Sequence, residues 1–227
     1  MTVIYLWRIP RHSIFQALFH MAFDRIFLLR LGGVTFFKSL GTGTGERFTP
    51  SDADPTLWGL LVVTDNIQAL DSSRVIRSWR KFALSESRTL LEPLSSHGLW
   101  AGKNPFFINQ PANEKTPSGN IAAITRARIK WSKNFLFWRA VPPVTDSLHS
   151  QPGLISAIGI GEAPVGLQGT FSIWQDSAAL RNFAYKGEAH AAVIEATKKH
   201  AWYAEELFAR FHVVEMRGSI ESGHTAE

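Results

Sequence analysis

The sequence predicts an α+β fold built from tandem ferredoxin-like repeats in one chain. The clearest sign of this fold is an internal sequence repeat, because the run Gly-Thr-Gly-Glu at 43–46 recurs as Gly-Ile-Gly-Glu at 159–162. Each run is followed by an apolar, strand-like segment, at 57–63 and at 169–174, and then by the pattern of a helix. Each half of the chain can therefore be divided into strand, helix, strand, strand, helix and strand.

The first repeat is expected to occupy residues 1–101. Apolar and alternating residues predict its strands, and helical periodicity predicts its helices. The strands are expected at 3–8, 34–40, 57–64 and 88–94, and the helices at 13–30 and 66–81.

The second repeat is expected to occupy residues 119–217. The segment 102–118 is rich in proline, asparagine and lysine, which is typical of a linker that crosses from one repeat to the next. The tail at 218–227 is expected to be disordered. The strands of the second repeat are expected at 121–129, 155–160, 169–174 and 208–215, and its helices at 133–148 and 177–199.

Two antiparallel four-stranded sheets of this kind pack face to face or close into a barrel, with the helices outside. Such a fold leaves an apolar space between sheet and helix. That space suits a flat macrocycle, and the second repeat is expected to provide it.

The helix at 13–30 is strongly apolar, but polar and charged residues interrupt it. A membrane-spanning helix needs about 20 largely uncharged residues, so we interpret this segment as a core helix. The alternative is peripheral contact with a bilayer surface, where the helix would collect a lipophilic substrate. The residues that would make this contact are Phe15, Phe19, Phe23 and Phe27.

Composition excludes several classes of chemistry. The chain has no cysteine, so it has no disulfide, no thiolate-bound haem and no cysteine nucleophile. The net charge of +5 is spread along the chain, which argues against a nucleic-acid site. The first ten residues look like a strand rather than a secretory signal, and a cytoplasmic location is expected.

Nucleotide and hydrolase motifs are also missing from the sequence. Gly-Thr-Gly-Thr-Gly-Glu at 41–46 lacks the third glycine of a dinucleotide site and the Lys-Ser/Thr of a P-loop, so we interpret it as a tight turn. Neither a Gly-x-Ser-x-Gly elbow nor a His-Glu-x-x-His helix is present.

The segment 180–194 points to a haem ligand. On helical periodicity Leu180, Phe183, Gly187 and His190 fall on one apolar face, and a neutral imidazole is a common iron ligand. A histidine on such a face is more often a hydrogen-bonded core residue, so the pattern leaves both interpretations open. Gly187 similarly either breaks the helix or lets a ring approach the backbone.

Several unrelated motifs, in one order along nearly the whole chain, resemble the spheroidene monooxygenase family of acyclic carotenoid ketolases. The resemblance implies a dimeric α/β barrel fold, haem b, dioxygen and an external electron donor such as reduced ferredoxin. It implies oxidation of a carotenoid at the carbon next to its methoxylated end. The matching runs are Gly-Thr-Gly-Thr-Gly-Glu-Arg-Phe-Thr-Pro at 41–50, Phe-Trp-Arg-Ala-Val-Pro at 137–142, Ile-Gly-Ile-Gly-Glu at 158–162, Thr-Phe-Ser-Ile-Trp at 170–174, His-Ala-Ala at 190–192 and Trp-Tyr-Ala-Glu-Glu-Leu-Phe-Ala-Arg-Phe at 202–211.

The resemblance also implies site residues. Phe183 to His190 looks like a pattern of haem-degrading monooxygenases in which the histidine is the axial ligand, and this favours His190 as the metal ligand. Phe183 and Gly187 would then lie at the cofactor.

Other residues in or beside the matching runs are weaker candidates. Arg126 and Arg139 would pair with haem propionates or take part in ordinary ion pairs. Trp138, Phe171 and Trp174 would line the porphyrin or polyene pocket or belong to the core.

Two other hypotheses remain open at this stage. The first is a haem-dependent dehydratase or nitrogen-chemistry enzyme, in which a substrate heteroatom binds the iron and no dioxygen is consumed. The second is a non-catalytic carrier of haem or a lipophilic molecule. Association of copies into a homo-oligomer is a further expectation.

Overall fold

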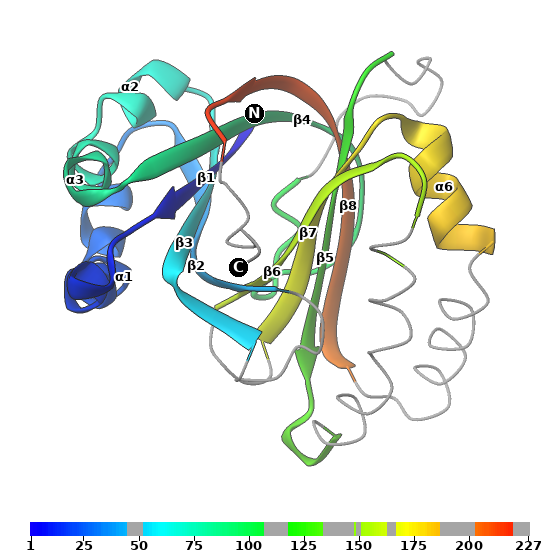
Figure 1. Cartoon of the computed structure of the whole chain (residues 1–227), viewed down its shortest axis with the longest axis horizontal. Coiled ribbons are helices and arrows are strands. Elements are labelled where there is room, and N and C mark those ends of the chain that lie inside the picture. The colour runs from blue at the N-terminus through cyan, green and yellow to red at the C-terminus, as the bar shows by residue number, and fades with distance from the viewer. Residues whose placement is uncertain are drawn as a thin grey trace, which may run out of the picture. The chain divides into compact units, whose positions relative to one another are not determined.

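The computed structural model describes residues 1–44, 52–106, 118–133, 148, 151–162, 167–186 and 203–219. Hydrogen bonding between neighbouring strands gives the eight described strands the order of a closed antiparallel barrel. Figure 1 labels these strands and the main helices. The strands are β1 (Thr2–Arg8), β2 (Val34–Gly43), β3 (Ala53–Thr64), β4 (Ser85–Gly98), β5 (Ile121–Ile129), β6 (Leu154–Gly161), β7 (Leu167–Trp174) and β8 (Tyr203–Arg217).

The strand order confirms the doubled plan. The first four strands follow the order β4-β1-β3-β2, and the last four follow β8-β5-β7-β6, which is the same order again. This order is that of a ferredoxin-like unit, in which the first and third strands are central. The predicted fold class is therefore confirmed. The division into repeats at 102–118 stays a prediction.

The described helices are short. They are η1 (Arg11–Ser13), α1 (Ile14–Leu28), α2 (Ile67–Asp71), α3 (Arg74–Phe82), η3 (Trp131–Lys133) and α6 (Ser177–Lys186). None of them is both long and apolar enough to cross a membrane. The predicted helix at 133–148 lies almost wholly outside the described residues, as do 187–199, most of the predicted linker and most of the tail.

The single helix predicted at 66–81 is wrong, because the chain forms two helices there. The Asn66 side chain accepts a hydrogen bond from the amide of Ala69, and the Ser73 side chain accepts one from Ile76. Each side chain therefore caps the start of its own helix. Ser73 begins the second helix two residues after the first one ends at Asp71, which apolar periodicity alone does not reveal.

The chain divides into two compact units. The first contains Met1–Leu40, Pro55–Leu91 and Val214–Glu227, and the second contains Gly41–Asp54 and Glu92–Val213.

In the first unit, aromatic rings form the centre of the core. Trp7 stacks between Tyr5 and Trp79, with ring centroids 5.3 Å and 4.9 Å apart, and all three rings are buried. Tyr5 donates its hydroxyl hydrogen to Asp71, and Arg88 bridges Asp71 and Glu215. Burial and the neighbouring Asp71 raise the pKa of Tyr5 far above its ordinary value, so the phenol stays neutral.

The core-helix interpretation of 13–30 is only partly right. The buried side chains of α1 are Ala17, His20, Asp24 and Leu28, and its phenylalanines face outward. Apolar residues occur on both sides of this helix, so its sequence pattern could not tell which side would be buried.

In the second unit, the two glycine-rich runs pair with each other. Gly41 lies opposite Gly161, Thr42 opposite Ile160 and Gly43 opposite Gly159. The tight turn predicted at 41–46 is therefore wrong at its start, because residues 41–43 are the end of β2. At Gly43 a side chain would lie 2.6 Å from the carbonyl oxygen of Asp52, so the close backbone approach requires glycine.

Candidate active site

Helix α6 carries Phe183, one of the predicted site residues that the structure describes. The half-buried ring of Phe183 stacks on the buried ring of Trp174, the last residue of β7, with centroids 5.3 Å apart and planes 29° apart. Leu180, one turn earlier on α6, is buried in the same cluster, together with Ile121 and Ala123 of β5. An apolar and aromatic wall thus lies where α6 covers β5 and β7 (Figure 1).

The register of β7 separates two residues that the sequence grouped together. Phe171 lies opposite Ile124, whereas Trp174 lies opposite Ile121. Because side chains alternate along a strand, residues three apart point to opposite faces of the sheet. Trp174 faces α6 and Phe171 faces away from it, so they do not line one wall. Both are buried.

Arg126, on the same face of β5 as Ile124, is the centre of a buried charge cluster. Its Nη2 donates to Oε2 of Glu162 at 2.9 Å, and its Nη1 donates to Oε1 of Glu205. The three side chains are 5%, 15% and 10% exposed. The Trp100 indole donates to Glu162 at 2.9 Å, and the guanidinium carbon of Arg126 lies 5.8 Å from its ring centre.

Glu205 is held as a carboxylate. It accepts hydrogen bonds from the backbone amides of Ala101 and Gly102, at 3.0 and 2.8 Å, as well as from Arg126. Burial alone would raise the pKa of Glu205, but these amides and the guanidinium outweigh it and lower the pKa below its ordinary value. Two carboxylates therefore surround one guanidinium, and both terminal nitrogens of Arg126 are engaged.

In this arrangement Arg126 takes part in ordinary ion pairs, which is one of the two roles that the sequence left open for it. Its pairing with a haem propionate stays a prediction. Sequence reasoning missed Glu162 and Glu205, although each lies in a run that matches the family. The signal in the sequence is that each carboxylate lies in a matching run, in or next to a strand, but which acidic residue contacts Arg126 depends on strand register.

The other predicted site residues lie outside the described residues. They are Trp138, Arg139, Gly187 and His190. Their assignments stay predictions. Within the described ranges, no group of three or more histidine, aspartate or glutamate side chains is placed to hold a metal ion.

Among the described histidines, His20 is engaged at both ring nitrogens. Nδ1 lies 2.9 Å from Oδ1 of Asp24, and Nε2 lies 3.2 Å from Oγ of Ser78. It is thus a hydrogen-bonded core histidine.

Comparison with characterised proteins finds three relatives, and all three belong to one family. The spheroidene monooxygenase of Rhodobacter capsulatus is 38% identical over 190 residues, which are 82% of this chain and 78% of the relative. The chain belongs to the spheroidene monooxygenase family. The corresponding proteins of Cereibacter sphaeroides and Rubrivivax gelatinosus are 35% and 34% identical, and the chain covers 58% and 71% of them. No protein-family model matches the chain.

Membership in the spheroidene monooxygenase family confirms the resemblance and makes the protein an oxidoreductase of the monooxygenase class. A solved aldoxime dehydratase has the same fold, with a TM-score of 0.58 at 12% identity over 93% of this chain and 80% of that chain. At this identity the likeness concerns the fold alone.

Proposed function

We propose that the protein is a haem-dependent monooxygenase that oxidises a lipophilic substrate, such as an acyclic carotenoid, with dioxygen and electrons from an external donor such as ferredoxin. The observation that carries the proposal is the 38% identity to a protein named spheroidene monooxygenase over most of both chains. The chain has no cysteine to bind an iron–sulfur cluster, so the proposal assigns the electrons to an external donor.

The described residues fit one side of a haem site. A porphyrin is flat and apolar over most of its area, and the half-buried ring of Phe183, stacked on the buried ring of Trp174, offers a flat, apolar surface. The porphyrin itself fills four positions on the iron, so a single side chain suffices to attach it to the protein. When bound, haem would supply the iron that activates dioxygen.

His190 is the residue that we propose to hold the iron. It follows Phe183 by seven residues, which is two helical turns, and Gly187 is one turn after Phe183. If the helical pattern continues past Lys186, the three residues lie on one face. Gly187 would then let a ring approach the backbone. Trp138 and Arg139 are proposed to line the pocket and to pair with a propionate.

The proposed reaction converts a methylene group to a ketone. Each hydroxylation replaces one C–H bond by C–OH, uses one dioxygen, two electrons and two protons, and releases one water. A second hydroxylation at the same carbon gives a geminal diol, which loses water to leave the carbonyl group. The chain's own part is to hold the polyene and to exclude bulk water with apolar side chains.

A spectroscopic experiment tests the haem site without any substrate. The full chain is expressed with haem supplied, and its Soret band and haem content are compared with those of His190→Ala and of the control His97→Ala, at an exposed histidine of β4. We expect His97→Ala to match the wild type and His190→Ala to lose or shift the band. Added imidazole should restore the band in His190→Ala by replacing the missing ligand. Equal spectra in all three proteins would contradict the assignment.

Oxygen uptake separates the proposal from its alternatives. A dehydratase would turn over without consuming dioxygen, and a carrier would bind its ligand without turnover under any reductant. The fold shared with aldoxime dehydratase does not favour the first alternative, because one fold hosts different reactions.

A further inference from the structure

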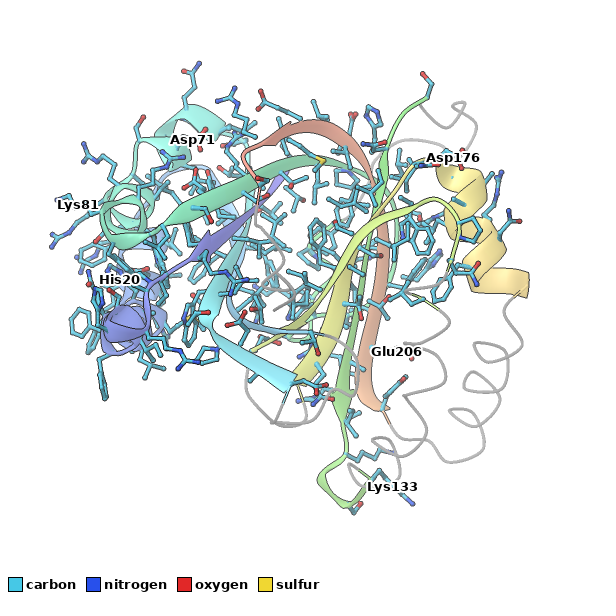
Figure 2. The ribbon with its side chains drawn as sticks, viewed as in Figure 1. His20, Asp71, Lys81, Lys133, Asp176 and Glu206 are labelled. Carbon is cyan, nitrogen blue, oxygen red and sulfur yellow. The ribbon has the colours of Figure 1, made fainter. Side chains whose placement is uncertain are left out.

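Helix α1 turns two polar side chains, His20 and Asp24, toward the inside. His20 and Asp24 are buried, and Oδ2 of Asp24 accepts a hydrogen bond from the Trp79 indole at 2.8 Å. His20 in turn contacts Ser78, so two hydrogen-bonding side chains join α1 to α3. Figure 2 shows His20 where α1 and α3 lie side by side. These polar contacts fix which face of α1 is turned outward.

The outward face of α1 is apolar, and we call it the phenylalanine face. Phe15 is 85% exposed and Phe19 is 60% exposed, and the rings of Phe19 and Phe23 lie 4.4 Å apart. Of the thirteen large hydrophobic side chains that are exposed in the described residues, seven lie on α1 or directly after it. The phenylalanine face consists of Phe15, Leu18, Phe19, Ala22, Phe23, Ile26, Phe27 and Leu29.

A concentration of exposed apolar residues of this kind marks an interaction surface. Isolated exposed hydrophobic residues are normal, but here they occupy successive turns of one helix. The helix has 15 residues, whereas about 20 are needed to span a bilayer. A helix of this length with an apolar outer face suits a position in the plane of a lipid surface.

Basic side chains border the phenylalanine face. Arg74, Arg77 and Lys81 of α3 are exposed and spaced three and four residues apart, so they form one row along the helix. The guanidinium of Arg74 lies 4.8 Å from the ring centre of Phe27, which places this end of the row against the apolar face. Figure 2 shows Lys81 on the same helix.

Acidic side chains are almost absent from these segments. Asp24 is the one acidic residue in 11–31 and 74–82, and it is buried. Arg11, Arg25 and Arg30 are exposed at the two ends of α1. The surface is therefore apolar in its centre and positive at its border, which complements a bilayer with anionic headgroups.

A second copy of the chain is a poorer partner for the same surface. A two-fold interface brings each patch against its own copy. Basic rows would then approach basic rows with no exposed acidic side chain of α1 or α3 to neutralise them, and like charges oppose association.

We propose that the phenylalanine face of α1, together with the basic row of α3, docks the protein on an anionic lipid surface. The apolar side chains enter the boundary between headgroups and acyl chains, and the basic row contacts the headgroups. A bilayer is also where a lipophilic substrate accumulates. The docking itself requires neither haem nor turnover, so it can fail or succeed independently of the proposed function.

Vesicle partition tests the proposal with the full chain. We expect binding to vesicles of phosphatidylcholine mixed with phosphatidylglycerol, and weaker binding to phosphatidylcholine alone. The double variant Phe15→Ser/Phe19→Ser should lower the partition coefficient about a hundredfold. The matched control is Ile155→Ser/Val214→Ser, two residues that are each 46% exposed on strands, and it should bind as the wild type does.

Charge reversal tests the border of the surface. Arg77→Glu/Lys81→Glu should weaken binding to the anionic vesicles about tenfold or more. The control Lys103→Glu/Lys130→Glu makes the same change in net charge at two exposed lysines outside α1 and α3, and it should have a much smaller effect.

A labelling experiment avoids any dependence on the phenylalanine variants. Because the chain has no cysteine, Ala22→Cys on α1 can be labelled alone with an environment-sensitive dye, and Ala178→Cys on α6 is the control at another exposed helical alanine. We expect the emission of the Ala22 label to shift to shorter wavelength with anionic vesicles and that of the control to stay unchanged.

Three results would overturn the proposal. The first is equal vesicle binding by the wild type and the double phenylalanine variant. The second is an unshifted Ala22 label in the presence of bound vesicles. The third is a dimer, detected by analytical ultracentrifugation, that does not bind vesicles and is lost in the double phenylalanine variant, because it would assign the face to a second copy.

Discussion

At the scale of single residues, the buried charge cluster shows how one side chain organises its surroundings. Arg126 lies between Glu162 and Glu205, and these residues come from separate segments of the second unit. The charges are buried, so each depends on its partners rather than on water. Sequence reasoning identified Arg126 as important, but it could not identify the carboxylates because their contact depends on strand register.

Replacement of Arg126 should be costly. Arg126→Met leaves two buried carboxylates without their cation, so we expect the free energy of unfolding to fall by about 3–5 kcal/mol. The control Arg181→Met removes an exposed arginine of α6 and should change stability by about 0.5 kcal/mol or less. Urea denaturation of both variants measures the difference. Similar small losses in both would mean that the cluster is not stabilised by its cation.

Glu205 should make stability depend on pH in the acidic range. Its folded-state pKa lies below the ordinary value of 4.5, so its stabilising contribution is present above that value and is lost as the pH falls through the folded-state pKa. Glu205→Gln should remove this part of the acid sensitivity. Unfolding free energies measured near neutral pH and in mild acid give the slope, and Glu206→Gln at the adjacent exposed position is the matched control. An unchanged slope in Glu205→Gln would refute this assignment.

At the scale of the elements, most strands could be predicted and helix details could not. The strand predicted at 121–129 matches β5 at both ends, because the polar residues Asn120 and Lys130 bound the segment. The segment 66–81 was predicted as one helix rather than two, because the start of the second helix depends on a single capping side chain, that of Ser73. The sequence left open whether the helix at 13–30 is a core helix or turns its phenylalanines outward, because both of its sides are apolar, and the contacts of His20 and Asp24 decide which side is buried.

The close packing of β7 against β5 leads to a testable prediction at the scale of the strands. A side chain at Gly169 would lie 2.3 Å from the carbonyl oxygen of Thr125 and 3.1 Å from Cα of Arg126. Gly169→Ala must therefore push β5 and β7 apart and should destabilise the fold by about 1–3 kcal/mol.

Gly41→Ala is the control for this strand substitution. A side chain at Gly41 would lie 3.7 Å from the nearest atom, which is an ordinary contact, so its stability should stay within about 1 kcal/mol of the wild type. Thermal unfolding of the two variants makes the comparison, and equal effects would show that the packing between β5 and β7 tolerates the extra methyl group.

At the scale of the whole molecule, the internal repeat is visible in both sequence and topology. The echoed glycine runs predicted two similar halves, and the repeated strand order bears this out. The direct pairing of one run with the other could not be foreseen, because a repeat in the sequence does not state which strands will be neighbours. The family could be predicted because its motifs span the chain, whereas the residues proposed to hold haem rest on the sequence pattern and the resemblance.

The most direct test of the account is oxygen consumption during turnover. The haem-loaded chain is supplied with a methoxylated acyclic carotenoid and a reduced ferredoxin, while dissolved oxygen and products are followed together. We predict that oxygen is consumed in proportion to a product that has gained a carbonyl group, and that His190→Ala abolishes both. Product formation without oxygen uptake, or tight binding of the carotenoid without turnover, would contradict the account.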